Sequence, residues 1–172
     1  MELQFTSPRR REALHFRLAA LILVPLFALI FQAYLPLYFS FVTFLNLPLL
    51  VVIYFALGGR NPVAGLFAGA LIGLMQDSIS GRMIGLFAIT NTIIGYAASF
   101  VSTRLDTENS GVRFLSTFIF CQIHFLCIFL LGSILPGETA EFAPLRNLLA
   151  ALVNSLAGVL LFKVLDRFRK PA

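Results

Sequence analysis

The chain has 172 residues, of which 59% are hydrophobic and 12% charged, with a mean hydropathy of +0.90. Soluble domains carry about 25% charged residues, so this composition excludes a water-soluble globule and predicts an integral membrane protein. The net charge of +5 comes from short basic clusters beside apolar stretches. We therefore attribute it to membrane topology and anionic lipid, and expect no nucleic-acid partner.

The first apolar stretch, residues 18–59, contains no charge and is about twice as long as one membrane-spanning helix requires. Pro36 lies in its middle between two tyrosines, and we expect a very short turn there, because proline disfavours a continuing helix and tyrosine favours a membrane interface. The sequence therefore predicts helices at about 16–35 and 38–57. One long tilted helix is the alternative. The first helix is expected to be retained, since it is too long for a signal peptide.

Four more apolar stretches follow, and polar turns separate them. They predict helices at about 62–77, 83–102, 113–135 and 145–167, so that residues 1–172 form one polytopic domain with six helices. If the six helices alternate in direction, 11 of the 13 lysines and arginines fall on one side, and only Arg82 and Arg146 on the other. By the positive-inside rule, both termini are predicted to be cytoplasmic.

Groups suited to catalysis are few in the predicted helices. The sequence has no motif for metal ligation, phosphate binding or nucleophilic catalysis, so we expect no enzyme activity, no cofactor and no metal site. His124 is expected to hydrogen-bond a neighbouring helix. The spacing of Cys121 and Cys127 suits neither a zinc site nor a redox pair, and it predicts small packing residues whose redox state stays open.

Glycines recur at every fourth position of the third predicted helix, at Gly65, Gly69 and Gly73. This spacing places them on one face and predicts a close approach by another helix backbone. The partner helix could belong to this chain or to another protein, and we favour this chain. Asn154 lies on a comparable face of small and polar residues in the last helix, and we expect it to hydrogen-bond across helices.

The segment between the third and fourth helices combines polar and small residues: Asp77, Ser80, Gly81, Arg82 and Gly85. A carboxylate at the edge of lipid is costly unless it is paired, so we expect an ion pair between Asp77 and Arg82. Ser80 and Gly81 suit a tight turn, and Gly85 leaves room at the start of the next helix. Two interpretations stay open: an ordinary helical hairpin, or a surface that a partner recognises.

This segment and the glycine-rich helix before it resemble a known family. Residues 75–88 read MQDSISGRMIGLFA, which is similar to the Asp, small-residue turn and apolar helix of the rod shape-determining protein MreD family. The resemblance implies a non-enzymatic scaffold of the bacterial elongation complex, in the inner (cytoplasmic) membrane, acting in cell shape and peptidoglycan synthesis. It also implies an all-α integral membrane fold of six transmembrane helices, similar to the substrate-binding subunits of energy-coupling-factor transporters.

The partners that the resemblance implies are an MreC-like protein and, through it, an MreB-like filament and a RodA-like glycosyltransferase with its transpeptidase, besides membrane lipid. The alternative function is that of a vitamin-binding subunit of an energy-coupling-factor transporter. Such subunits use a roomy loop after the first helix and an Ala-x-x-x-Ala pattern on that helix. The sequence has neither: the turn expected at Pro36 is short, and the first helix reads Ala20, Val24 and Ala28 at this spacing. Partner stoichiometry, the partner-binding face and the presence of a ligand cavity stay open.

Overall fold

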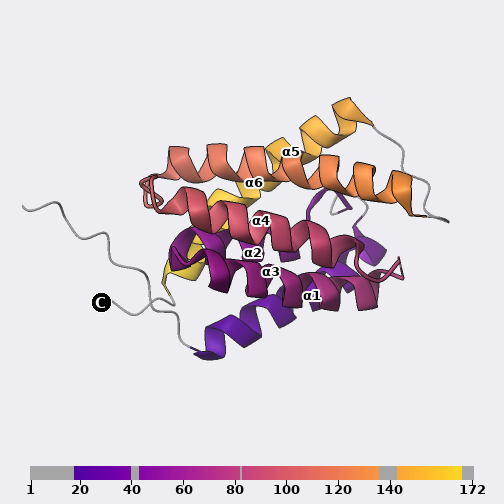
Figure 1. Ribbon diagram of the computed structural model, residues 1–172, viewed down its shortest axis with the longest axis horizontal. Helices are drawn as coiled ribbons and strands as arrows, with labels where there is room; N and C mark the ends of the chain where they lie inside the picture. Colours follow the sequence, from indigo (N-terminus) through magenta and orange to yellow (C-terminus); the bar gives the residue numbers. More distant parts are fainter. Residues whose placement is uncertain (1–17, 40–42, 82, 136–142, 168–172) are drawn as a thin grey trace, which may run out of the picture.

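The computed structural model describes residues 18–39, 43–81, 83–135 and 143–167. The described residues form six α-helices: α1 (Leu18–Tyr38), α2 (Leu47–Gly59), α3 (Pro62–Ser80), α4 (Leu86–Ser102), α5 (Ser110–Ile134) and α6 (Pro144–Asp166). Successive helices run in opposite directions along one bundle (Figure 1). The prediction of an all-helical protein with six helices is confirmed.

The bundle has two ends, which we name after one residue at each. The Arg113 end holds the start of α1, the α2–α3 turn, the α4–α5 connection and the end of α6 (Figure 1). The Gly81 end holds the α3–α4 connection, the end of α5 and the start of α6. α1 also ends and α2 also begins toward the Gly81 end. The chain therefore reverses direction three times at this end: between α1 and α2, between α3 and α4, and between α5 and α6.

Asparagine side chains start three of the helices. Asn46, Asn61 and Asn109 each accept hydrogen bonds from backbone N–H groups in the first turn of α2, α3 and α5, at 2.8 to 3.2 Å. These caps satisfy backbone donors that no earlier turn of the helix can reach. α3 ends at Gly81, whose φ of 65° is a left-handed conformation that glycine adopts without strain.

Four of the helices, α1, α3, α5 and α6, are long and apolar enough to cross a membrane. By contrast, α2 has 13 residues and is about 20 Å long, less than the roughly 30 Å of a bilayer core. Eleven of its residues are buried, and it packs against each of the other five helices. An apolar helix enclosed in this way forms the core of the bundle.

The predicted turn at Pro36 is wrong. α1 continues through Pro36 to Tyr38, and the backbone N–H of Phe39 still donates to the Leu35 carbonyl at 3.0 Å. Proline removes one donor, whereas ending the helix in lipid would leave several backbone groups without partners. The second helix therefore begins at Leu47 instead of at about residue 38, and the connection covers residues 39–46, of which 40–42 lie outside the described residues.

The other helix limits also differ from the predicted ones. α3 was predicted to end at Asp77 but continues to Ser80, because the left-handed residue that stops it is Gly81. α4 begins at Leu86, not at about residue 83. The Asn109 cap starts α5 at Ser110, before the predicted start at about residue 113, and α6 lies within one residue of its predicted range. Asp77 therefore lies inside a helix.

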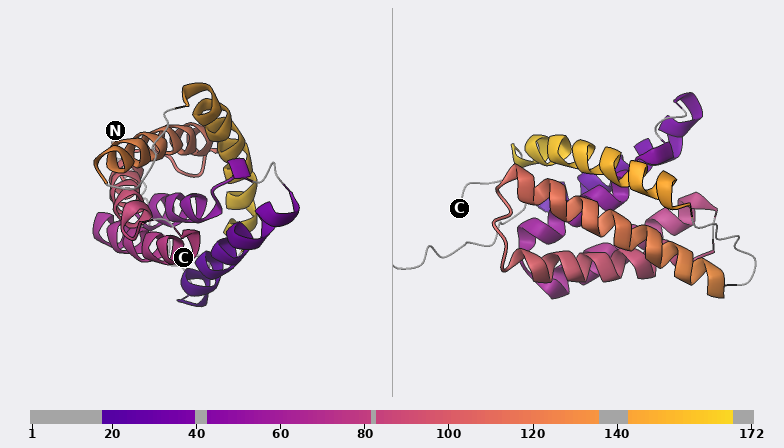
Figure 2. Two further views of the ribbon diagram at one scale, coloured as in Figure 1. Left: turned by 90° about the vertical axis from the view of Figure 1, so that its right-hand side faces the viewer. Right: turned by 90° about the horizontal axis from the view of Figure 1, so that it is seen from above.

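The first helix stands apart from the other five. α1 packs against α2 and α3, and within the described residues no α-carbon of α1 comes within 8 Å of one in α6. Seen along the bundle, α1 lies outside the ring that the other helices form (Figure 2). An apolar groove of about 500 Å³ remains between α1, α2 and α6.

Candidate functional site

The three glycines of α3 face α4 along a close antiparallel contact. A Cβ atom on Gly69 would overlap the backbone carbonyl of Asn91, and one on Gly73 would overlap the backbone of Ala88. Gly65 meets the carbonyl of Gly95 on α4 in the same way. The partner helix of the glycine face is therefore α4 of the same chain, and the two backbones approach too closely for any side chain between them.

Asp77 lies in the last turn of α3, and its side chain caps the start of α4. Its carboxylate accepts hydrogen bonds from the backbone N–H groups of Gly85 at 2.9 Å, Phe87 at 2.9 Å and Ala88 at 3.0 Å. The residue is 1% exposed. A negative charge at the start of α4 also interacts favourably with the helix dipole. We call this arrangement the Asp77 cap; it joins the last turn of α3 to the first turn of α4.

The predicted partner of Asp77, Arg82, lies outside the described residues. Three N–H donors at the start of α4 stabilise the Asp77 carboxylate within the described residues, and the ion pair with Arg82 stays a prediction. Gly85 has a φ of 110°, and its N–H can reach back to Asp77 because glycine tolerates this conformation. The Ser80 hydroxyl donates to the Asp77 carbonyl at 3.2 Å.

Polar side chains from five helices and from the residue before α2 meet in the interior. We call this set the polar layer: Gln32, Asn46, Gln76, Asn91, His124 and Asn154. Asn46 is at its centre. Its backbone N–H donates to Asn154 Oδ1 at 2.8 Å, its Nδ2 lies 3.2 Å from His124 Nε2, and its Oδ1 accepts from Gln76 Nε2 at 3.4 Å.

The polar layer extends on both sides of this centre. Gln76 Oε1 accepts from Asn91 Nδ2 at 3.1 Å, and Gln32 Oε1 accepts from the backbone N–H of Leu47 at 3.0 Å. Asn91 and Asn154 are fully buried. Buried amides are costly unless they are bonded, so the layer fixes the start of α2 at one depth in the bundle.

Some members of this layer were predicted from the sequence, and others were not. His124 and Asn154 bond to other segments, as we expected, although both contact the residues that lead into α2 instead of another helix. Gln76 was not identified as a site residue. A signal for it was present, because Gln76 lies one turn after Gly73 and is therefore close to the glycine face that meets α4.

A pocket of about 1,120 Å³ lies between the polar layer and the Gly81 end. Asn46, Gln76 and His124 line it together with Ser80 from the end of α3 and Arg146 from the start of α6. Its apolar walls combine aliphatic side chains with four phenylalanines: Phe44, Phe87, Phe125 and Phe129. We call this the Gly81-end pocket. Its lining combines hydrogen-bonding groups with apolar surface, which suits an occupant of mixed polarity.

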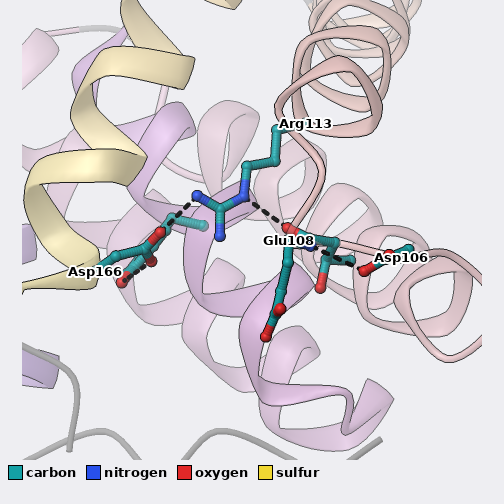
Figure 3. A network of polar contacts seen from close by, with 6 residues as sticks. Asp106, Glu108, Arg113 and Asp166 are labelled. Carbon is teal, nitrogen blue, oxygen red and sulfur yellow. Dashed lines mark hydrogen bonds and ion pairs between the residues drawn. The ribbon is translucent and has the colours of Figure 1, made fainter.

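The Arg113 end has a different chemistry. Arg113 Nη1 forms an ion pair with Asp166 Oδ2 at 2.6 Å, and its Nε donates to the Thr107 carbonyl at 2.6 Å (Figure 3). The Tyr54 hydroxyl donates to the other Asp166 oxygen at 3.2 Å, and the guanidinium lies 6.0 Å from the Phe162 ring centre. Arg113 is only 6% exposed. We call this the Arg113 cluster.

From the sequence, Arg113 was expected only as a topological charge, and its pairing with Asp166 was not predicted. A signal for the pair exists once the order of the helices is known. Because α5 and α6 are antiparallel neighbours, the start of α5 must lie beside the end of α6, and these positions carry opposite charges. The pair ties the first turn of α5 to the last turn of α6.

The described side chains offer binding groups more than reactive ones. Within the described ranges, no three His, Cys, Asp or Glu residues gather in a way that could hold a metal ion. Cys121 and Cys127 are both free thiols, the first buried and the second half-buried. What this site can do chemically is to enclose an occupant and form hydrogen bonds to it.

Comparison with known proteins gives one match. A family model described as rod shape-determining protein MreD matches residues 13–169. The matched range contains all six helices, and with them the glycine face, the Asp77 cap, the polar layer and the pocket. No match was found among curated proteins or among solved structures.

Proposed function

The chain belongs to the MreD family of rod shape-determining proteins, and from this premise we propose that it is a non-enzymatic scaffold of the bacterial cell-elongation complex. The family gives it a role in determining rod shape. In the proposed role it lies in the inner membrane, binds an MreC-like protein and, through it, acts with an MreB-like filament and a RodA-like glycosyltransferase with its transpeptidase in peptidoglycan synthesis.

The proposed topology has six membrane crossings and cytoplasmic termini. Among the described residues, Arg60, Arg104 and Arg113 lie at the Arg113 end, and Arg146 lies at the other. The excess of basic residues at the Arg113 end supports a cytoplasmic position for that end. The short α2 fits this topology because other helices surround it. The Gly81-end pocket then opens toward the outer side of the membrane.

The observation that carries the proposal is the Gly81-end pocket within a chain of this family. Its volume of about 1,120 Å³ is slightly larger than the roughly 300 to 1,000 Å³ of typical small-molecule pockets, which suits an occupant as large as a protein segment. Amides at its base can bond the polar groups of a polypeptide, and phenylalanines on its walls can pack against apolar side chains. We propose that a segment of the MreC-like partner docks in this pocket, with Ser80 at the rim.

Two observations favour a second candidate function. The connection between α1 and α2 is longer than we expected from the sequence, and a roomy pocket with polar groups lies beside it. Both features suit the vitamin-binding subunit of an energy-coupling-factor transporter. For this function a vitamin-sized molecule, not a protein segment, would occupy the Gly81-end pocket.

The experiment that tests the proposal obstructs the pocket with a single side chain. Ile128 lines the pocket on α5, whereas Leu126 on the same helix is 47% exposed on the outside of the bundle. We expect Ile128→Trp to abolish co-purification of the MreC-like partner in detergent and to fail to restore rod shape in a depleted strain. Leu126→Trp, the matched control, should do neither.

Three results distinguish the candidates. If Ile128→Trp accumulates in the membrane, binds the partner and restores rod shape, then the pocket is not the docking site. If the purified wild-type chain carries a vitamin that mass spectrometry detects and that Ile128→Trp loses, the transporter function is favoured. A reporter fused to the C-terminus that is active only outside the cytoplasm would contradict the proposed topology.

A further inference from the structure

The hydrogen bonds around Asn46 fix which way its side-chain amide points. The backbone N–H of Leu49 can only donate, and it bonds to Asn46 Oδ1 at 3.2 Å. Gln76 Nε2 donates to the same oxygen at 3.4 Å. The Asn46 side chain must therefore present its Nδ2, a donor, to Nε2 of His124 at 3.2 Å.

This orientation determines where the histidine carries its proton. Because Asn46 Nδ2 donates, His124 Nε2 must accept and cannot carry a hydrogen. A neutral imidazole has one N–H, so the proton lies on Nδ1. Unlike Nε2, Nδ1 is buried without a hydrogen-bond partner among the described residues. The polar layer thus contains a donor that no described group satisfies.

The position of this donor relates it to the Gly81-end pocket. His124 is 2% exposed and lines the pocket, and its ring contacts two other lining residues: it is stacked on Phe87 at 6.0 Å and edge-on to Phe125 at 5.9 Å between ring centres. No described group bonds Nδ1, and the residue that carries it lines the pocket. A buried unsatisfied donor is costly, so a matching acceptor would stabilise the bound state.

We infer that His124 Nδ1–H is the donor with which the Gly81-end pocket recognises an acceptor oxygen of its occupant. The inference rests on the proposed function, from which we take the occupant to be a polypeptide segment and the acceptor to be one of its carbonyl or carboxylate oxygens. The polar layer sets this specificity through the chain of bonds from Leu49 through Asn46 to His124. Asn46 is then a positioning residue for the tautomer.

Nitrogen NMR of the chain labelled at histidine tests the tautomer and the contact directly. The protein has 2 histidines, so replacing His15 with Gln leaves the signals of His124 alone. In the free protein we expect a protonated Nδ1 and an unprotonated Nε2. Addition of the MreC-like partner should shift the Nδ1 signal and leave Nε2 unprotonated. A proton on Nε2, or an Nδ1 signal that the partner does not move, would overturn the inference.

Two substitutions at His124 separate its two nitrogens. His124→Gln places an amide near the former Nε2, so the bond from Asn46 is kept and the Nδ1 donor is lost. His124→Asn places an amide near the former Nδ1 and loses the group that Asn46 bonds. We expect partner affinity to fall about tenfold in His124→Gln, but less than about threefold in correctly folded His124→Asn.

The outcomes keep the inference distinct from the proposed function. If the wild type binds the partner and Ile128→Trp abolishes this binding, the docking site is supported, independently of the results at His124. If the docking site holds but His124→Gln binds as tightly as the wild type, the inference is wrong and a buried water satisfies Nδ1. If Nδ1 responds to phospholipid in nanodiscs and not to the partner, the acceptor belongs to a lipid head group, and the inference is again wrong.

Discussion

The two ends of the bundle bury polar groups in opposite ways. At the Arg113 end a charged pair is closed off by contacts with Tyr54, Thr107 and an aromatic ring. At the Gly81 end neutral amides and one imidazole lie beneath a pocket of about 1,120 Å³. An ion pair that loses a partner is strongly destabilised, whereas a neutral amide can exchange partners at lower cost. The closed end therefore suits permanent assembly, and the open end suits binding.

The largest predicted effect tests the closed end. Arg113→Met removes the cation and so breaks the ion pair between Arg113 and the Asp166 carboxylate, which is 29% exposed. We expect the free energy of unfolding to fall by about 3 kcal/mol. This value is closer to the loss for a buried ion pair than to that for an exposed one, because Arg113 is almost fully buried. Thermal unfolding in detergent measures the change. The double variant Arg113→Met with Asp166→Leu should recover much of this stability, and no recovery would contradict the ion-pair explanation.

The next effect tests the contact that connects the two ends. Gly69→Ala adds a Cβ that overlaps the Asn91 backbone, and α3 and α4 must separate to admit it. We expect a loss of about 2 kcal/mol, within the range for overpacking. Gly59→Ala is the matched control, because a Cβ on Gly59 has no atom within 4 Å. Equal melting temperatures for the two variants would show that α3 and α4 are not packed as described.

A smaller effect is expected at the Asp77 cap. Asp77→Asn keeps the shape of the side chain but replaces one accepting oxygen with a donor and removes the charge at the start of α4. The loss should be about 1 to 2 kcal/mol. If the cap also shapes the rim of the pocket, the variant protein that remains in the membrane will retain less of the MreC-like partner. If the variant is less stable but retains the MreC-like partner normally, the Asp77 cap contributes to folding and not to partner binding.

The smallest effect on stability is expected at the rim of the open end. Arg146 is exposed in the first turn of α6 and lines the Gly81-end pocket. Arg146→Gln should change the free energy of unfolding by less than about 0.5 kcal/mol. If the occupant carries a negative charge near the rim, it should associate with the variant more slowly than with the wild type. The association rate with the variant should also no longer depend on salt concentration. An unchanged rate at low salt would show that Arg146 contributes nothing to docking.

The sequence was sufficient for the features that depend on local spacing. The uncharged stretches predicted six helices, and three glycines at every fourth position predicted a close helix contact. Both signals depend on composition and on the helical period, which lipid makes strict. The break at Pro36 was predicted wrongly because proline at membrane depth does not end a helix when ending it would expose more backbone groups to lipid.

Features that depend on which segments contact each other in the fold could not be predicted from local spacing in the sequence. The three N–H groups that bond Asp77 come from Gly85 and from the first turn of α4, and their position depends on the backbone conformation of Gly81 and Gly85. The polar layer joins residues as far apart as Asn46 and Asn154. Their types were visible in the sequence, but their pairing required the depth at which the short α2 begins.

The burial of α2 has a consequence for how the protein is made. α2 is the second helix to leave the ribosome, yet it packs against α3, α4, α5 and α6, which are synthesised later. At about 20 Å it is also too short to cross the bilayer core alone. α2 therefore reaches its final position only after the later helices have entered the membrane. The cap at Asn46 has its full set of hydrogen bonds only once α6 has brought Asn154, so α6 completes the fold.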